Sequence, residues 1–305
     1  FNLTYKNREL EFMRNEKEML DLILRTAVND PEIRAVYMNG SRTNPNVKKD
    51  IFQDYDIVYV VNEIKTFLDA ENWIDVFGKR LYMQLPEALD KSLGKDVDTD
   101  NCYGWLIQLA DGNRIDLHLQ TAAFAKNEIL KDKLCIVLLD KDNILPDIPP
   151  ASDIDYHVQK PSQAEFSACC NEFWWILNNV GKGLWRGEIT YVMDMINFYL
   201  RPELIKMLSW DIGIKTEFSC SIGKSGKYMK KFLSEDIWNR FLATYSAAET
   251  DSVWNSVFTA VDLFDETAVK SAFSFKYIYD TNEAKNSRSF LLHTFSLPKD
   301  AEEIL

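Results

Sequence analysis

Two aspartates separated by one tyrosine are the residues of this sequence whose types and spacing best fit chemistry. Asp54, Tyr55 and Asp56 stand at the start of the run YDIVYVV, which predicts a buried strand over residues 55–61. Side chains alternate across a strand, so the two carboxylates share one face. Two like charges so close are costly unless a cation lies between them. Paired carboxylates suit Mg²⁺, which completes its shell with substrate phosphates, although an isolated pair of this kind is more often a solvated turn.

A glycine-serine turn precedes this pair. Gly40, Ser41 and Arg42 follow a short predicted strand at residues 33–38, and Arg42 lies 12 residues before Asp54. Glycine lets a backbone come close to a phosphate, serine offers a hydroxyl and a backbone N–H, and arginine offers positive charge. A turn of this composition is common on its own, and beside paired carboxylates it favours a phosphate site.

A third acid comes from a predicted hairpin whose strands are residues 103–109 and 114–119, joined by the turn Ala-Asp-Gly-Asn. Asp116 alternates with three apolar residues, so it shares the opposite face of its strand with His118. A buried acid is expensive unless it has a partner such as a metal, and an edge strand with one wet face is the alternative interpretation. His118 is a second candidate for a catalytic base.

These residues need a scaffold that brings them together. Hydrophobic periodicity predicts helices in the first half over residues 14–29 and 66–77 and, besides the strands above, one more strand over 134–139. The second half predicts helices over residues 165–200, 202–210 and 234–245 and no convincing strand between 162 and 270.

A stretch with four prolines, residues 144–161, separates the two halves. We therefore predict an α+β protein. Its first domain, residues 1–150, has a mixed sheet with flanking helices. Its second domain, residues 151–305, is helical.

Charge and composition exclude several functional classes. The formal charge is −12, with 19 basic and 26 acidic residues in 1–150 and 16 and 21 in 151–305. Such a surface repels nucleic acid and anionic membranes. No stretch reaches the roughly 18 apolar residues of a membrane span, and the five cysteines and three histidines form no zinc motif. We expect a soluble cytoplasmic protein whose oligomeric state the sequence does not reveal.

The order of the glycine-serine turn, the paired acid and the distal acid is similar to the nucleotidyltransferase fold related to DNA polymerase β. Longer strings resemble the bacterial aminoglycoside 6-adenylyltransferases, which inactivate streptomycin. The resemblance covers roughly residues 13–260 and keeps its order through both domains. The strings are GSRTNPNVKKDIFQDYDIVYVV (40–61), CCNEFWWILNNVGKGLWRGEI (169–189), NFYLRPELIKMLSW (197–210) and SIGKSGKYMKKFL (221–233).

This resemblance implies transfer of AMP from ATP to a hydroxyl of streptomycin or a related aminoglycoside, with release of pyrophosphate, and hence antibiotic resistance. It implies that Asp54 and Asp56 bind two Mg²⁺ ions, that Asp116 is a further metal ligand or the proton acceptor, and that Gly40, Ser41 and Arg42 hold the triphosphate. By the same resemblance the first domain binds ATP and Mg²⁺, and the second binds the other substrate and closes the cleft. The alternatives are a nucleotidyltransferase with another acceptor and a catalytically silent relative that binds nucleotide or drug.

A second group of candidates lies on the predicted helix 163–186. At alternating spacings of three and four, the residues Glu172, Trp175, Asn179, Lys182 and Arg186 form one mixed face, which is either solvated or a cleft wall. In the cleft interpretation Lys182 and Arg186 contact ATP phosphates, and Glu172 and Trp175 lie near the cationic sugar. Gly181 and Gly183 weaken this helix near its end.

Three further residues complete the candidate set. Glu188 and Asp194 are acids that could pair with the guanidinium groups of streptomycin. Lys224 lies in SIGKSGK, residues 221–227, which resembles a P-loop but has Phe218 where the motif requires its first glycine and has no strand before it. Lys224 is therefore a secondary candidate for a phosphate contact.

Overall fold

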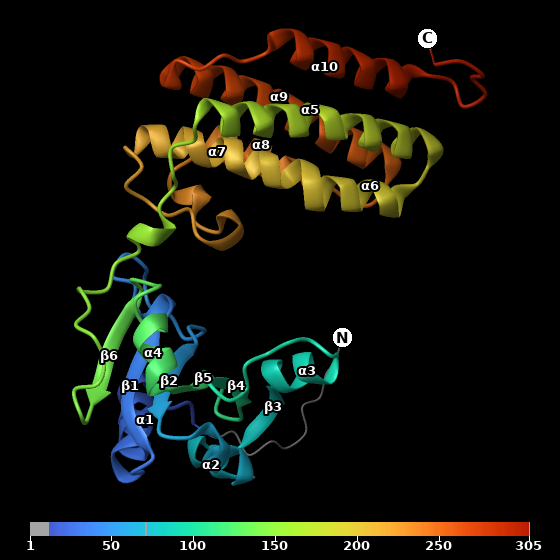
Figure 1. Cartoon of the computed structure of the whole chain (residues 1–305). Coiled ribbons are helices and arrows are strands. Elements are labelled where there is room, and N and C mark those ends of the chain that lie inside the picture. The colour runs from blue at the N-terminus through green and yellow to red at the C-terminus, as the bar shows by residue number, and fades with distance from the viewer. Residues whose placement is uncertain (1–11, 71, 305) are drawn as a thin grey trace. The chain divides into compact units, whose positions relative to one another are not determined.

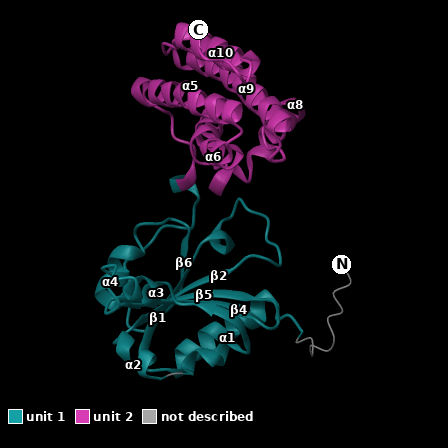
Figure 2. Ribbon diagram, turned by 90° about the vertical axis from the view of Figure 1, so that its right-hand side faces the viewer, with its two compact units in different colours: residues 1–155 teal, residues 156–305 magenta. Residues whose placement is uncertain are grey.

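The computed structural model of this protein describes residues 12–70 and 72–304. The chain divides after Asp155 into two compact units, coloured separately in Figure 2. The predicted boundary followed residue 150, and the proline-rich stretch 144–161 contains the observed one. The first unit carries a sheet with helices, and the described part of the second carries helices alone, so the predicted α+β class is confirmed.

The first unit is built on a mixed six-stranded sheet with the order β3-β4-β5-β2-β1-β6 (Figure 1). The strands β2 and β5 are parallel neighbours, and the other neighbouring pairs are antiparallel. The predicted hairpin is confirmed as β4 and β5, whereas β3 had no sequence prediction. The strands are β1 (Ile33–Asn39), β2 (Tyr55–Val61), β3 (Arg80–Gln84), β4 (Cys102–Leu109), β5 (Arg114–Thr121) and β6 (Cys135–Asp140).

The predicted helix over residues 66–77 is wrong. The helix α2 spans only Ile64–Asp69, and a separate 3₁₀ turn spans Trp73–Phe77. The rings of Phe67 and Trp73 meet edge to face with centroids 4.9 Å apart. Residues six positions apart point in different directions from one helix, so this contact requires the chain to break between them. The remaining helices of the unit are α1 (Glu16–Asn29), α3 (Pro86–Ser92) and α4 (Ala122–Glu128).

The two faces of the sheet have separate cores. On one face α1 and α2 cover the alternate residues Ile57 of β2 and Leu117 of β5, which are fully buried. On the other face Ala125 of α4 packs with Val58 and Val60 of β2. Strand alternation therefore places Asp56 and Asp116 on the α4 side, and the predicted alternation of β5 is confirmed.

The second unit consists of helices in its described part, which confirms the prediction of a helical second half. The predicted helix 163–186 is confirmed as α5, and the helical periodicity over 165–200 continues into α6 and a π-helical turn, because Gly187 takes a left-handed φ of +75° and ends α5. Residues 261–275 belong to α9 and residues 281–296 to α10. The elements are α5 (Gln163–Arg186), α6 (Ile189–Met195), a π-helical turn (Ile196–Leu200), α7 (Arg201–Lys215), α8 (Glu235–Ala243), α9 (Thr250–Phe275) and α10 (Thr281–Ser296).

The long helix α5 organises this unit. A capping box of Ser162 and Glu165 fixes its start. Its Phe173 is fully buried and stacks on Phe264 of α9 with ring centroids 3.7 Å apart. Gly181 does not interrupt the helix: a Cβ there would lie 3.1 Å from Leu291 of α10, so the missing side chain makes room for close helix packing.

All five cysteines are free thiols, and Cys135, Cys169 and Cys170 are buried. Among the described residues, no helix combines the length and the apolar character needed to cross a membrane.

Replacing Phe173 by Ala should destabilise the second unit by about 3–5 kcal/mol, because the stacked pair with Phe264 loses its contacts and leaves a cavity. Trp175→Ala is the matched control, since this neighbour on the same helix is 67% exposed and its loss should cost less than about 0.5 kcal/mol. Chemical denaturation followed by circular dichroism measures both, and equal losses would contradict this packing.

Candidate functional site

The sheet register brings the predicted acids together. Asp56 of β2 lies opposite Asp116 of β5 in the parallel pair and opposite Asn39 of β1 in the antiparallel pair. Neighbouring strands are about 4.8 Å apart, so the three side chains form a row across the α4 face of the sheet. Asp54 precedes β2 by one residue and joins the row at its edge. Asp116, which is distant in the sequence from Asp54 and Asp56, therefore lies together with them, and we call these three residues the carboxylate cluster.

The glycine-serine turn runs directly against this cluster. Gly40 follows β1 with a φ of +78°, and a Cβ built there would lie 2.1 Å from Oδ2 of Asp56. Only glycine fits, both for its backbone angle and for this approach. The Gly40 N–H donates to the Leu134 carbonyl at 3.1 Å, and Ser41 begins a 3₁₀ turn, Ser41–Thr43. The predicted juxtaposition of the turn and Asp56 is thus present.

The guanidinium of Arg42 is engaged with protein groups, whereas a phosphate ligand would be expected to face the solvent. Its guanidinium is buried, donates to the carbonyls of Gln53 at 2.8 Å and Asp54 at 3.1 Å, and lies 3.7 Å from the centre of the Tyr55 ring. Glu16 is 3.7 Å away. These contacts hold the polar loop 42–53 against the start of β2, so Arg42 positions the paired acids, and its phosphate contact stays a prediction.

Arg114 is the site residue that sequence reasoning missed. It opens β5 and donates to both carboxylate oxygens of Asp116, at 2.8 and 2.7 Å, and its Nε lies 3.6 Å from Asp54. Its side chain is 43% exposed, whereas that of Asp116 is 14% exposed. Alternation along a strand places residues two apart on one face, so the pattern Arg-Ile-Asp contained the signal.

The electrostatics of the cluster follow from crowding and burial. Burial, with the charges of Asp116 and Asp54, raises the pKa of Asp56 to about 6. Burial also raises the pKa of Asp54, while the nearby Arg114 opposes this rise. Three carboxylates share one exposed cation here, so the cluster is short of positive charge.

The donor set fits a hard divalent cation. Asp54, Asp56 and Asp116 offer carboxylate oxygens, and the buried Oδ1 of Asn39 beside Asp56 has no hydrogen-bond partner. Mg²⁺ commonly takes one or two carboxylates and completes its shell with water and phosphate. Within the described residues, no three His, Cys, Asp or Glu side chains converge on one point, and both oxygens of Asp116 are bonded to Arg114.

His118 lies further along the same strand face. A Cβ on Gly104 of β4 would lie 2.6 Å from the His118 ring, so the imidazole covers the bare backbone of that glycine. Trp105 is buried and packs edge to face on Trp73, with centroids 5.4 Å apart. Trp105 is therefore a core residue.

The predicted stripe of α5 is realised as one helix face. The helix is continuous from Gln163 to Arg186, so Glu172, Trp175 and Lys182 keep their helical phase. Glu172, Trp175 and Arg186 are exposed, and Lys182 is half-buried. The stripe extends roughly 20 Å along the helix, so its acid and its last base are far apart.

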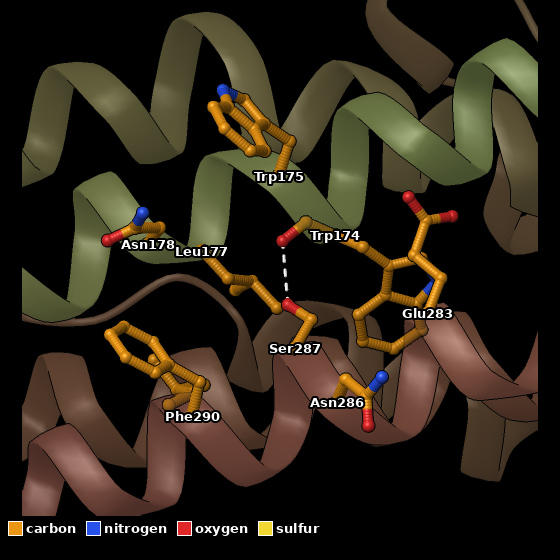
Figure 3. A pocket seen from close by; sticks show the side chains of 9 residues that line it. Trp174, Trp175, Leu177, Asn178, Glu283, Asn286, Ser287 and Phe290 are labelled. Atoms are coloured by element: carbon orange, nitrogen blue, oxygen red, sulfur yellow. Dashed lines mark hydrogen bonds between the residues drawn. The ribbon is translucent and has the colours of Figure 1, made fainter. Parts of the chain in front are cut away.

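A pocket of about 310 Å³ lies between α5 and α10 (Figure 3). Trp175 stands on its α5 side, and Glu283, Asn286 and Phe290 come from α10. Asn171 donates to the Glu283 carboxylate. Cations bind favourably to aromatic rings and carboxylates that line one pocket. The sequence analysis did not identify the residues that α10 contributes.

The other second-unit candidates lie elsewhere in that unit. Glu188 precedes α6 and lies 3.9 Å from Arg186, so an acid predicted for the substrate meets a base predicted for ATP. Asp194 is on α6 and exposed. Lys224 is exposed in the 3₁₀ turn Lys224–Gly226, and no strand precedes it, so the P-loop interpretation is excluded by the fold.

Comparison with known proteins extends this picture. Residues 13–294 match the sequence profile of the family described as streptomycin adenylyltransferase, so the likeness runs beyond residue 260, where we expected it to end. A curated Aminoglycoside 6-adenylyltransferase of Campylobacter jejuni is 40% identical over 275 residues, 90% of this chain and 94% of that protein. A second, from Bacillus subtilis strain 168, is 39% identical over 87% of this chain and 93% of its own.

Among solved structures, an aminoglycoside 6-adenyltransferase from Bacillus subtilis aligns with 93% of this chain and all of its own. Its sequence identity is 32% and the TM-score is 0.47.

Asp56→Asn should stabilise the metal-free protein above pH 6. The folded pKa of about 6 exceeds the ordinary 3.8, so the folded state binds more protons between those values and wild-type stability falls as pH rises through them. In the Asp56→Asn protein this fall in stability should disappear, so its free energy of unfolding at pH 7.5 should exceed that of the wild type by about 1–2 kcal/mol. Denaturation in EDTA from pH 4 to pH 8 measures it.

Asp142→Asn is the control for this measurement. Arg34 lowers the pKa of Asp142 through a paired hydrogen bond, so its loss should weaken the protein at neutral pH, the opposite sign. An Asp56→Asn protein that loses stability at every pH would contradict a carboxylate held under repulsion.

Gly40→Ala should destabilise the protein more than Gly94→Ala. Both glycines have a φ of +78°, but a Cβ at Gly94 meets nothing within 4 Å, whereas at Gly40 it collides with Asp56. Gly40 also has a ψ of −158°, in a backbone region nearly restricted to glycine, so the difference between the two variants contains this backbone strain as well as the collision. It should shrink when Asp56 is also replaced by Ala. Denaturation of the four variants forms the test, and equal costs at both glycines would show that the turn does not press on Asp56.

Proposed function

Because this chain belongs to the streptomycin adenylyltransferase family, we propose that it transfers AMP from ATP to a hydroxyl of streptomycin or a related aminoglycoside and releases pyrophosphate. Such a transfer inactivates the antibiotic and so confers resistance on the cell. The observation that carries the proposal is the row of Asp54, Asp56 and Asp116 against the Gly40 turn. An enzyme that consumes ATP in this way works in the cytoplasm.

The carboxylates of Asp54 and Asp56 would hold two Mg²⁺ ions, with the amide oxygen of Asn39 beside them. Bound Mg²⁺ supplies positive charge that offsets the phosphate oxygens. Gly40 and Ser41 bring a backbone without a side-chain obstacle to the acids, so their segment would lie along the triphosphate. The raised pKa values of Asp54 and Asp56 support this assignment, because such a cluster gains from any cation it binds.

The chemical step transfers AMP to a hydroxyl oxygen and the hydroxyl proton to a base. The hydroxyl oxygen of the aminoglycoside bonds to the α-phosphorus, the bond to pyrophosphate breaks, and the hydroxyl proton passes to a base. Asp116 is the assigned acceptor when it is not a metal ligand, and His118, two residues along the same strand face, is its rival.

The second unit would supply the remaining contacts. Glu172, Trp175, Glu188 and Asp194 are assigned to the cationic antibiotic, and Lys182, Arg186 and Lys224 to ATP phosphates. The exposed indole of Trp175, which lines the same pocket as the carboxylate of Glu283, supports cation binding on α5. The acidic balance of the chain, −12 overall, also favours a cationic acceptor.

Replacing Asp54 or Asp56 by Ala should reduce AMP transfer by about three orders of magnitude or more, because the ligands of the metal are lost. The measurement is mass spectrometry of streptomycin after incubation with protein, ATP and Mg²⁺, with circular dichroism to confirm the fold. Asp142→Ala removes an acid outside the cluster and should retain near-normal turnover.

The same assay separates the parts of the proposal. If streptomycin stays unmodified while another aminoglycoside receives AMP and pyrophosphate is released, the reaction stands and streptomycin is overturned as the acceptor. Near-normal turnover in the Asp56→Ala protein would remove this cluster as the active site.

A further inference from the structure

Arg114 is the one exposed cation that pairs with the carboxylate cluster in the described part of the chain. Its guanidinium forms two parallel hydrogen bonds to Asp116 and lies 3.6 Å from Asp54. Both oxygens of Asp116 are thereby occupied. In this arrangement the three carboxylates do not converge on one point, so Arg114 takes up the oxygens that a metal would need.

Arg42, the other arginine near the cluster, is held differently. It is buried, and its guanidinium is bound by two backbone carbonyls and the Tyr55 ring. Moving it would leave those carbonyls unpaired, which is costly. Among the described residues, the Arg114 side chain hydrogen-bonds to Asp116 alone, and 43% of it is exposed. Only Arg114 can therefore leave at low cost.

Building on the proposed function, we propose that Arg114 is an exchangeable counter-cation. While no metal is bound, its guanidinium neutralises Asp116 and holds it in place. A divalent cation that takes Asp116 displaces the guanidinium, which then pairs with phosphate oxygens of the nucleotide. A planar guanidinium binds carboxylate and phosphate with the same two-pronged geometry, so one side chain serves both partners.

This exchange moves metal and nucleotide affinity in opposite directions. Arg114→Gln removes the competitor, so Mn²⁺ alone should bind about three- to thirtyfold more tightly. The same variant lacks the phosphate partner, so ATP in the presence of Mg²⁺ should bind about tenfold more weakly. A residue that merely supports the fold would shift both affinities the same way.

The test measures free Mn²⁺ by electron paramagnetic resonance during titration of the full chain, and ATP affinity by calorimetry. Arg114→Lys keeps the charge without the paired geometry and should fall between wild type and Arg114→Gln in both. Arg34→Gln is the matched control, because Arg34 makes an equivalent paired contact with Asp142 outside the cluster and its loss should leave both affinities unchanged. Thermal unfolding in EDTA confirms that each variant folds.

The outcomes distinguish this inference from the function on which it rests. Equal Mn²⁺ affinity in wild type and Arg114→Gln would leave the metal site in place and overturn the exchange. Failure of both proteins to bind Mn²⁺, with or without ATP, would overturn the metal assignment and the exchange with it. If Arg114→Gln binds Mn²⁺ more tightly but ATP as well as the wild type does, the proposed pairing of Arg114 with the nucleotide phosphates would be overturned.

Discussion

Repulsion among three carboxylates is the constraint on which the first unit depends. Backbone pairing places Asp56 beside Asp116, and the pairing cannot slip by one residue without turning Ile115, Leu117 and Leu119 out of the core. The hydrophobic side of the sheet thus enforces an unfavourable charge arrangement on its other side. The protein offsets part of that cost with the guanidinium of Arg114, and the part left over favours any further cation that binds beside these carboxylates.

The loop before β2 follows from the same constraint. Asp54 must stay near Asp56 although it lies outside the strand. The buried Arg42 holds it there by donating to the backbone carbonyls of Gln53 and Asp54. Gly40 approaches from β1 with no side chain to collide with Asp56. Two neighbouring residues of one turn therefore have different tasks. The arginine fixes the backbone, and the glycine leaves space.

Much of this architecture could be predicted from the sequence. The alternation in β5 placed Asp116 and His118 on one face, the β-branched run located β2, and the order of motifs indicated the family. Contacts between side chains were less predictable. The break between α2 and the turn at Trp73 depends on a tertiary contact with Phe67, and the bonds of Arg42 depend on a loop path that no periodicity encodes. Arg114 was within reach, because strand alternation alone places it beside Asp116.

The parallel pairing of β2 and β5 has a consequence for how the chain folds. The hairpin of β4 and β5 is local and closes quickly, whereas β5 can join β2 only after residues 62–113 have formed a large loop. Asp56 and Asp116 are therefore far apart through the early stages of folding and meet only when this long-range pairing forms. The repulsion between these carboxylates is thus absent while the chain first collapses, and it cannot slow that collapse.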